Sequence, residues 1–301
     1  MKKLQDNILA CAAETPLVRL GRIAPLGAGQ VLAKLELMNV SGSAKIRSAL
    51  AMVEAAEAAG LLRPGAIIAE ASSGNGGIGM AAVGAVKGYK VIVVMPDNAS
   101  VERQQLIRAY GAEVVLTPRE ERVAGAIAKV AEIKAANPDT FTPESMGNPA
   151  NPDSHFRTTG REILRQYPGR IDVFVAGAGS GGTLTGVARA LKVAHPAMKV
   201  YVANPDPGTS VVAGVGRYGA GSSFPAVFER DLLDGFIDVP DEDTIAMTKA
   251  LAQKEGILAG PSSGMVVSAA ARLAAEMGPG STVVTILMDT GERYLSTGLF
   301  D

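Results

Sequence analysis

The chain has 301 residues, which is long enough for two domains with sizeable cores. Its 29 Lys and Arg balance 30 Asp and Glu, Trp is absent and aromatic residues make up 4 %, so neither a nucleic acid nor an anionic membrane is expected as a partner. A single cysteine, Cys11, excludes an internal disulfide framework and a thiolate metal cluster, and we expect it to be a small packing residue.

The N-terminal residues give an expectation about location. Two lysines are followed by polar side chains, without the continuous apolar stretch of a signal peptide. No apolar run elsewhere approaches the length that spans a membrane. We therefore expect a cytoplasmic protein.

Short apolar runs alternate along the chain with longer alanine-rich helical patterns. The runs predict buried strands at residues 31–37, 66–69, 91–95, 113–116, 173–176, 199–202 and 283–288. The patterns between them predict helices at residues 48–59, 78–88, 101–111, 183–195, 242–256 and 263–277. Such alternation predicts an α/β fold of two domains, each a mostly parallel twisted sheet flanked by helices.

The clearest boundary signal is the turn-rich segment 148–153, Asn-Pro-Ala-Asn-Pro-Asp, near the middle of the chain. No internal repeat accompanies it. Ligands of open α/β sheets bind beyond the carboxyl ends of the strands and often between domains, so the expected site is a cleft at those ends.

Two glycine-rich turns each follow a predicted strand and open a predicted helix. The second, Gly179-Ser180-Gly181-Gly182-Thr183, places successive backbone N–H groups and two hydroxyls at a helix start, which suits a phosphate. The first, Ser72-Ser73-Gly74-Asn75-Gly76-Gly77, offers a similar set of donors to a smaller anion such as a carboxylate. With Lys45 at the start of another helix, these turns suggest a phosphorylated cofactor held covalently above an amino-acid substrate.

Each of these features also has a simpler interpretation. Taken locally, Lys45 reads as a solvated surface lysine, Asn75 as a turn residue and the serines as helix caps. Residues 177–182 loosely fit the GxGxxG pattern of dinucleotide folds, but position 199, where an acidic residue is expected, is Lys. Nicotinamide binding is therefore a distant second interpretation.

The two histidines are weak candidates for chemistry. We interpret His155 as structural, and His195 ends a predicted helix beside a proline. Neither has the acidic and histidine neighbours of a metal site, so no metal is expected.

Taken in register, these landmarks resemble the pyridoxal-phosphate enzymes of the cysteine synthase and cystathionine β-synthase family. The resemblance runs from Thr15-Pro16-Leu17-Val18-Arg19-Leu20 to the segment 291–297, Gly-Glu-Arg-Tyr-Leu-Ser-Thr. It implies the fold of fold type II enzymes, related to the tryptophan synthase β subunit, and assembly as a homodimer. It also implies a smaller mobile domain at 36–147, and a larger domain at 1–35 and 148–301 that carries the phosphate loop.

The resemblance implies roles for individual residues. Lys45 matches the lysine that holds pyridoxal 5′-phosphate as a Schiff base and moves the α-proton. Asn75 matches the residue that hydrogen-bonds the cofactor's ring oxygen, and Ser262, with Ser263 as a close alternative, matches the contact to the pyridine nitrogen. The remaining matches are the phosphate loop, Gly179, Ser180, Gly181, Gly182 and Thr183, and the substrate residues Ser72, Ser73, Gly74, Asn75, Gly76 and Ser145.

Departures from the family pattern concern the substrate. Ile46 replaces the usual Asp after the lysine, Gly76 replaces a Thr of the asparagine turn, and Ser145-Met146 stand where Gln-Phe is usual. The segment 206–224 is atypical as well. The phosphate loop is intact, so the cofactor is better supported than any named substrate.

The expected reaction is therefore β-replacement on an O-activated L-serine through an aminoacrylate, with sulfide as the nucleophile. One alternative is a serine/threonine dehydratase-like β-elimination or a replacement by an amine nucleophile, which Ile46 and the double serine favour. Another is a catalytically weak homologue that acts as a binding partner.

Overall fold

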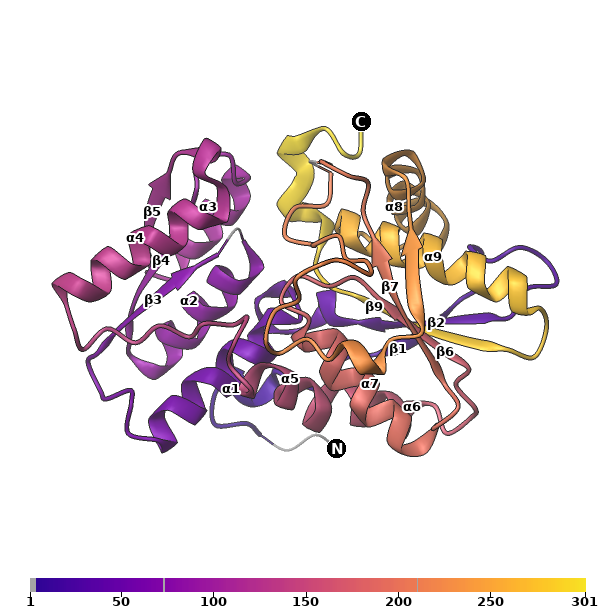
Figure 1. Ribbon diagram of the computed structural model, residues 1–301, viewed down its shortest axis with the longest axis horizontal. Helices are drawn as coiled ribbons and strands as arrows, with labels where there is room; N and C mark the ends of the chain where they lie inside the picture. The colour runs from indigo at the N-terminus through magenta and orange to yellow at the C-terminus, as the bar shows by residue number, and fades with distance from the viewer. Residues whose placement is uncertain (1–3, 73, 210) are drawn as a thin grey trace.

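The computed structural model describes residues 4–72, 74–209 and 211–301, which form two sheets flanked by helices (Figure 1). The six-stranded sheet has the order β1 (Leu17–Leu20), β2 (Gln30–Leu35), β9 (Thr282–Leu287), β6 (Val173–Ala176), β7 (Lys199–Asn204) and β8 (Gly235–Asp238). The three-stranded sheet has the order β3 (Ile67–Ala71), β4 (Lys90–Pro96) and β5 (Glu113–Thr117). All pairings are parallel except β1 with β2, so the predicted α/β fold is confirmed.

The helices cover both faces of both sheets. They are α1 (Lys45–Ala58), α2 (Asn75–Lys87), α3 (Val101–Ala109), α4 (Arg122–Ala136), α5 (Ala150–His155), α6 (Arg161–Gln166), α7 (Gly182–Ala194), α8 (Asp241–Glu255) and α9 (Pro261–Met277). Short helical turns join them: η1 (Ile8–Cys11), η2 (Glu36–Met38), η3 (Val40–Gly42), η4 (Arg119–Glu121), η5 (Phe156–Gly160), η6 (Arg230–Leu232) and η7 (Gly291–Thr297).

Alternating side chains of the strands explain this double cover. In β4, Val91, Val93 and Met95 join the core formed with α1 and α2, whereas Ile92 and Val94 join the core under α4. The six-stranded sheet divides in the same way, with one core under α9 and another under α7. Strands buried on both faces read as continuous apolar runs, which is why the sequence identifies them.

The structure differs from the predicted elements mainly at their ends. The first predicted strand ends at Leu35, where η2 begins, and the helices predicted from residues 48 and 78 begin at Lys45 and Asn75. The turn-rich segment 148–153 is partly helical, because α5 begins at Ala150 and accommodates Pro152 in its first turn, where no intrahelical donor is needed. The strands β1 and β8 and the helices α4 to α6 are not among the predicted elements.

The N-terminal segment corrects one expectation. Cys11 is exposed, because it ends the single turn η1, whose buried side chain is Leu9. Among the described residues, no helix is both long and apolar enough to cross a membrane.

A buried ion cluster fixes α1 against the six-stranded sheet. Arg47 of α1 forms ion pairs with Glu36, at 2.8 Å, and with Glu162 of α6, at 2.6 Å. Lys34 of β2 pairs with the same Glu162 at 2.7 Å. All four side chains are almost wholly buried, and breaking such a pair leaves an uncompensated charge that costs about 3–5 kcal/mol. The position of Lys45, two residues before Arg47, is therefore closely set.

The two glycine turns occupy equivalent positions in the two sheets, each between a strand and the helix that follows it. One follows β3 and opens α2, and the other follows β6 and opens α7. Figure 1 shows the three-stranded sheet with α1 to α4 on one side of the molecule and the larger sheet on the other. The segment 36–147 includes the whole three-stranded sheet, and its bounds as a domain remain a prediction.

Candidate active site

A cavity of about 210 Å³ lies where the turns after β3 and β6 meet the start of α1. It brings together nearly all of the residues that the sequence singles out. Gly182 is not among the lining residues, and Ser73 falls outside the described residues. The predicted residues that line the cavity are Lys45, Ser72, Gly74, Asn75, Gly76, Ser145, Gly179, Ser180, Gly181, Thr183 and Ser262.

Lys45, the first residue of α1, supplies an amine to this cavity. Burial lowers the pKa of Lys45, while the carboxyls of Glu70 and Asp289 act in the opposite direction. Because a neutral amine is the nucleophilic form, the lowered pKa favours covalent attachment to an aldehyde. Lys45 is half-buried and lines the cavity, so the local interpretation as a solvated surface residue is wrong.

The turn before α7 is shaped by contacts that only glycine permits. Gly181 has φ +83°, and a Cβ there would overlap the Phe228 side chain. A Cβ on Gly182 would overlap Asn151, whose Nδ2 donates to Ser180 Oγ at 3.1 Å. The first N–H groups of α7 have no intrahelical acceptor, so they form a preformed anion site.

Thr183, in the first turn of α7, is held from behind by His155. Its Oγ1 lies 3.1 Å from His155 Nε2, and His155 Nδ1 lies 2.9 Å from Thr159 Oγ1. Burial, followed by the charges of Arg47 and Lys45, keeps the pKa of His155 well below its usual value. The neutral imidazole thus orients the Thr183 hydroxyl, a role that agrees with the structural interpretation of His155.

The turn before α2 is organised by its own serine. Ser72 Oγ accepts from the N–H groups of Gly77, at 2.9 Å, and Gly74, at 3.3 Å. The N–H groups of Asn75 and Gly76 open the helix and have no intrahelical acceptor. They are the donors that this turn presents to an anion.

The Asn75 carboxamide is oriented by groups near the C-terminus. Its Nδ2 donates to Asp289 Oδ2 at 2.6 Å, and its Oδ1 accepts from Arg293 Nη1 at 2.6 Å. An amide nitrogen carries two hydrogens, so one N–H is left for a ligand in the cavity. The predicted contact of Asn75 with a ring oxygen is compatible with this arrangement.

The two candidate serines at the start of α9 differ in position. Ser262 is half-buried and lines the cavity, whereas Ser263 is fully buried and does not line it. Ser145 also lines the cavity, and its carbonyl accepts from Asn151 Nδ2 at 2.8 Å.

Two acidic residues at the cavity are absent from the sequence-based predictions. Glu70 is the last residue but one of the otherwise apolar strand β3, and Asp289 follows the apolar strand β9. Both could have been found from the sequence, because each is a charged residue near or just after the end of a buried strand. Ile46, by contrast, was singled out from the sequence but does not line the cavity. Its side chain is fully buried in the core between α1 and α2.

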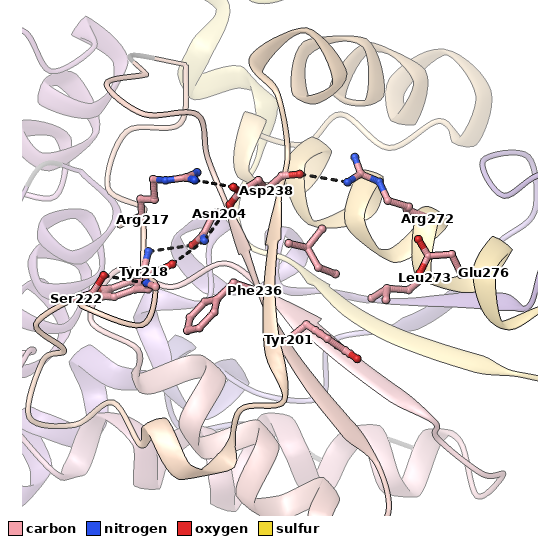
Figure 2. A pocket seen from close by; sticks show the side chains of 12 residues that line it. Tyr201, Asn204, Arg217, Tyr218, Ser222, Phe236, Asp238, Arg272, Leu273 and Glu276 are labelled. Carbon is pink, nitrogen blue, oxygen red and sulfur yellow. Dashed lines mark hydrogen bonds and ion pairs between the residues drawn. The ribbon is translucent and has the colours of Figure 1, made fainter.

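A more open hollow of about 750 Å³ lies at the edge strand β8 (Figure 2). Its two arginines are already engaged within the protein. Arg217 Nη2 pairs with Asp238 Oδ2 at 2.6 Å, and Arg272 donates to the Asp238 carbonyl at 3.2 Å. The smaller cavity beside Lys45 is therefore the stronger candidate site.

Comparison with known proteins agrees with this choice. Residues 8–289 match the family described as pyridoxal-phosphate dependent enzyme. The chain belongs to this family. It is 46 % identical over 310 residues to a probable cysteine synthase of Bacillus subtilis, covering 100 % of this chain and 99 % of the relative. A cysteine synthase of Staphylococcus aureus is 44 % identical over 309 residues, with 99 % and 98 % covered.

Solved structures extend the likeness to the whole fold. An O-ureido-L-serine synthase superposes with a TM-score of 0.93 at 39 % identity, covering 99 % of this chain and 96 % of that chain. An O-acetylserine dependent cystathionine β-synthase from Helicobacter pylori superposes with a TM-score of 0.93 at 34 % identity, with both chains fully covered. The chain is thus a pyridoxal-phosphate-dependent enzyme of the cysteine synthase type, and its fold is that of fold type II.

The cavity fits pyridoxal 5′-phosphate on physical grounds. It combines an amine with lowered pKa, a glycine cradle at a helix start and hydroxyls from Thr183 and Ser262. These are the groups needed to hold an aldehyde, a phosphate and a ring nitrogen.

Proposed function

We propose that this enzyme catalyses β-replacement on an O-activated L-serine, with sulfide as the nucleophile. One observation carries the proposal: the Lys45 amine and two helix starts, those of α2 and α7, face a single cavity. One helix start is suited to the cofactor's phosphate and the other to the carboxylate of an amino acid.

Residue roles follow from the positions of the side chains. Gly179 to Thr183 would hold the phosphate, the free N–H of Asn75 would contact the ring oxygen, and Ser262 would contact the ring nitrogen. When bound, the cofactor withdraws electrons from the substrate's α-carbon. The neutral serine at position 262 makes this withdrawal weaker than an aspartate would, which suits loss of a good β-leaving group.

Lys45 would act as the base for the α-proton. Its lowered pKa supports this role, because an amine that is neutral near the working pH can accept a proton. The substrate carboxylate would lie at the start of α2, on the N–H groups of Asn75 and Gly76, with Ser72, Gly74 and Ser145 around it. The role expected of Ser73 stays a prediction from the sequence.

Contacts between α3 and the C-terminal turn η7 support closure of the smaller domain over the cavity. Arg103 Nη2 donates to the Tyr294 hydroxyl at 2.9 Å, and Glu102 accepts from the backbone and side chain of Ser296. We propose that residues 36–147 move as a unit and that these contacts exclude water from the reaction.

A second function has a specific observation in its favour. Gly76 carries no side chain at the substrate turn, and an O-ureido-L-serine synthase is among the similar structures. A nucleophile larger than sulfide, such as an amine, is therefore the alternative, together with β-elimination in the absence of a nucleophile.

Product analysis separates these reactions. The purified protein, loaded with pyridoxal 5′-phosphate, is mixed with O-acetyl-L-serine alone, with sulfide, and with an amine. We expect cysteine as the main product with sulfide. Pyruvate and ammonia in every mixture would instead identify an eliminase, and no consumption of the substrate would reject both reactions.

A homodimer and a cytoplasmic location are further proposals, which rest on the family resemblance. Sedimentation equilibrium at micromolar concentration tests the first, with twice the chain mass as the expected result.

A further inference from the structure

Glu70 is a buried acid that the proposed mechanism leaves without a role. It lies at the carboxyl end of β3, is 6 % exposed and lines the cavity. Within the described chain, the structure gives its carboxyl no hydrogen bond or ion pair. A buried carboxyl without such a partner is costly unless it is protonated or meets a ligand.

The charges around Glu70 come from several elements. Lys45 of α1 is the charge that acts on it directly, and the cavity also holds Asp289 after β9, Arg103 of α3 and Tyr294 of η7. Asp289, Arg103 and Tyr294 are already linked by hydrogen bonds to one another. Glu70 and Lys45 thus remain as the acid and the amine that face the cavity without such bonds.

At Gly76 no side chain lies against the Glu70 carboxyl. A Cβ at this position would lie 3.6 Å from Glu70 Oε1 and 2.9 Å from Ser72 Oγ. The Thr that is usual here in the resembling family would therefore place its side chain next to the carboxyl. In this chain the carboxyl faces the space beside the substrate turn.

We propose that Glu70 is a further catalytic residue, whose carboxyl donates a proton to the oxygen that leaves the substrate's β-carbon. This inference rests on the proposed β-replacement. As the C–O bond breaks, the oxygen keeps the bonding electron pair and takes the Glu70 proton. As the bond to the nucleophile forms, the nucleophile's proton returns to the Glu70 carboxylate, so the proton balance closes in each cycle.

The protonation state of Glu70 supports this role. Burial raises the pKa of Glu70 to about 8, although the neighbouring Lys45 charge acts to lower it. The carboxyl is therefore mostly protonated at neutral pH and able to donate, and it loses this ability as the pH rises through about 8.

The first test requires no turnover. Protein labelled with ¹³C at the glutamate carboxyls is titrated by NMR, with and without pyridoxal 5′-phosphate, for the wild type, Glu70→Gln and the control Glu113→Gln on β5. We expect one resonance with a midpoint near pH 8 in the wild type and the control, and its absence in Glu70→Gln. If every glutamate titrates near the ordinary value of about 4.3, the proposal is wrong.

The second test is the pH dependence of a ratio. We compare kcat/KM for O-acetyl-L-serine between the wild type and Glu70→Gln, so that the titration of sulfide cancels. The wild type is expected to be faster by about tenfold to a hundredfold at pH 7, with the ratio falling toward one above pH 9. A ratio that does not change with pH overturns the proposal, because a merely structural role would lower the rate equally at each pH.

Folding is checked by circular dichroism and by cofactor content. If Glu70→Gln does not fold, Glu70→Asp serves in its place, since it keeps a carboxyl group but withdraws it by one methylene. Failure of the wild type to consume O-acetyl-L-serine would reject the proposed function and the leaving-group role together. The NMR titration would still report whether Glu70 holds its proton.

Discussion

The two helix starts at the cavity are built in different ways. The turn before α7 is filled from behind, because Phe228 and Asn151 leave no room for side chains at Gly181 and Gly182. The turn before α2 is capped by its own Ser72, and a Cβ at Gly76 would lie 2.9 Å from the Ser72 hydroxyl and 3.6 Å from the Glu70 carboxyl. The turn before α7 therefore requires glycine at both positions. The turn before α2 can accept a small side chain at position 76 if the Ser72 hydroxyl shifts slightly.

The largest expected effect comes from removing the Lys45 amine, which faces both glycine turns. Lys45→Ala should lower turnover by at least about a thousandfold, because it removes both the covalent attachment and the base. Borohydride reduction should then leave no cofactor on the chain. Lys129→Ala, on the exposed face of α4, is the control. A variant that still retains reducible cofactor and full turnover would reject the site as a whole.

A substitution in the turn before α7 tests its rigidity. Gly181→Ala adds a clash with Phe228 to a left-handed backbone, and we expect cofactor affinity to fall by about tenfold to a hundredfold. Gly208→Ala is the matched control, since its φ is +74° and no atom lies within 4 Å of the added Cβ. Equal losses in affinity would mean that the turn is not held by Phe228. Fluorescence titration of the cofactor-free protein measures the affinities.

The pH dependence of stability tests the support behind Thr183. The lowered pKa of His155 means that the unfolded chain binds a proton below about pH 6.5 while the folded chain does not. This contribution therefore lowers the free energy of unfolding as the pH falls, by at most about 1.4 kcal/mol per pH unit. In urea unfolding experiments, the free energy of unfolding of His155→Gln should fall less steeply with decreasing pH than that of the wild type. An unchanged slope would show that His155 is protonated in the fold.

The smallest expected effect is at the substrate turn. Gly76→Ala places a methyl group near Ser72 Oγ, whose small displacement relieves the contact. We expect KM for the amino acid to change by about two- to fivefold, consistent with a cost below about 1 kcal/mol, and cofactor affinity to be unchanged. A loss of cofactor affinity in Gly76→Ala would contradict the assignment of substrate binding to the turn before α2 and of phosphate binding to the turn before α7.

The sequence predicts most of this architecture for physical reasons. Strands buried on both faces appear as apolar runs, and the glycine turns mark the helix starts at Asn75 and Gly182. Lys45 cannot be distinguished from a surface lysine without its partners in space. The links of Asn75 with Asp289 and Arg293 join positions more than 200 residues apart, so local sequence patterns do not reveal them.

The strand order also bears on how the molecule is made. The three-stranded sheet uses one continuous stretch, residues 67–117, and can form as soon as that stretch leaves the ribosome. In the larger sheet β2 pairs with β9, so residues 30–35 must wait for residues 282–287. Asp289 and η7 complete the cavity later still. A nascent chain therefore gains a cofactor site only when its translation is almost finished, and vitamin B6 bound to it reports a completed molecule.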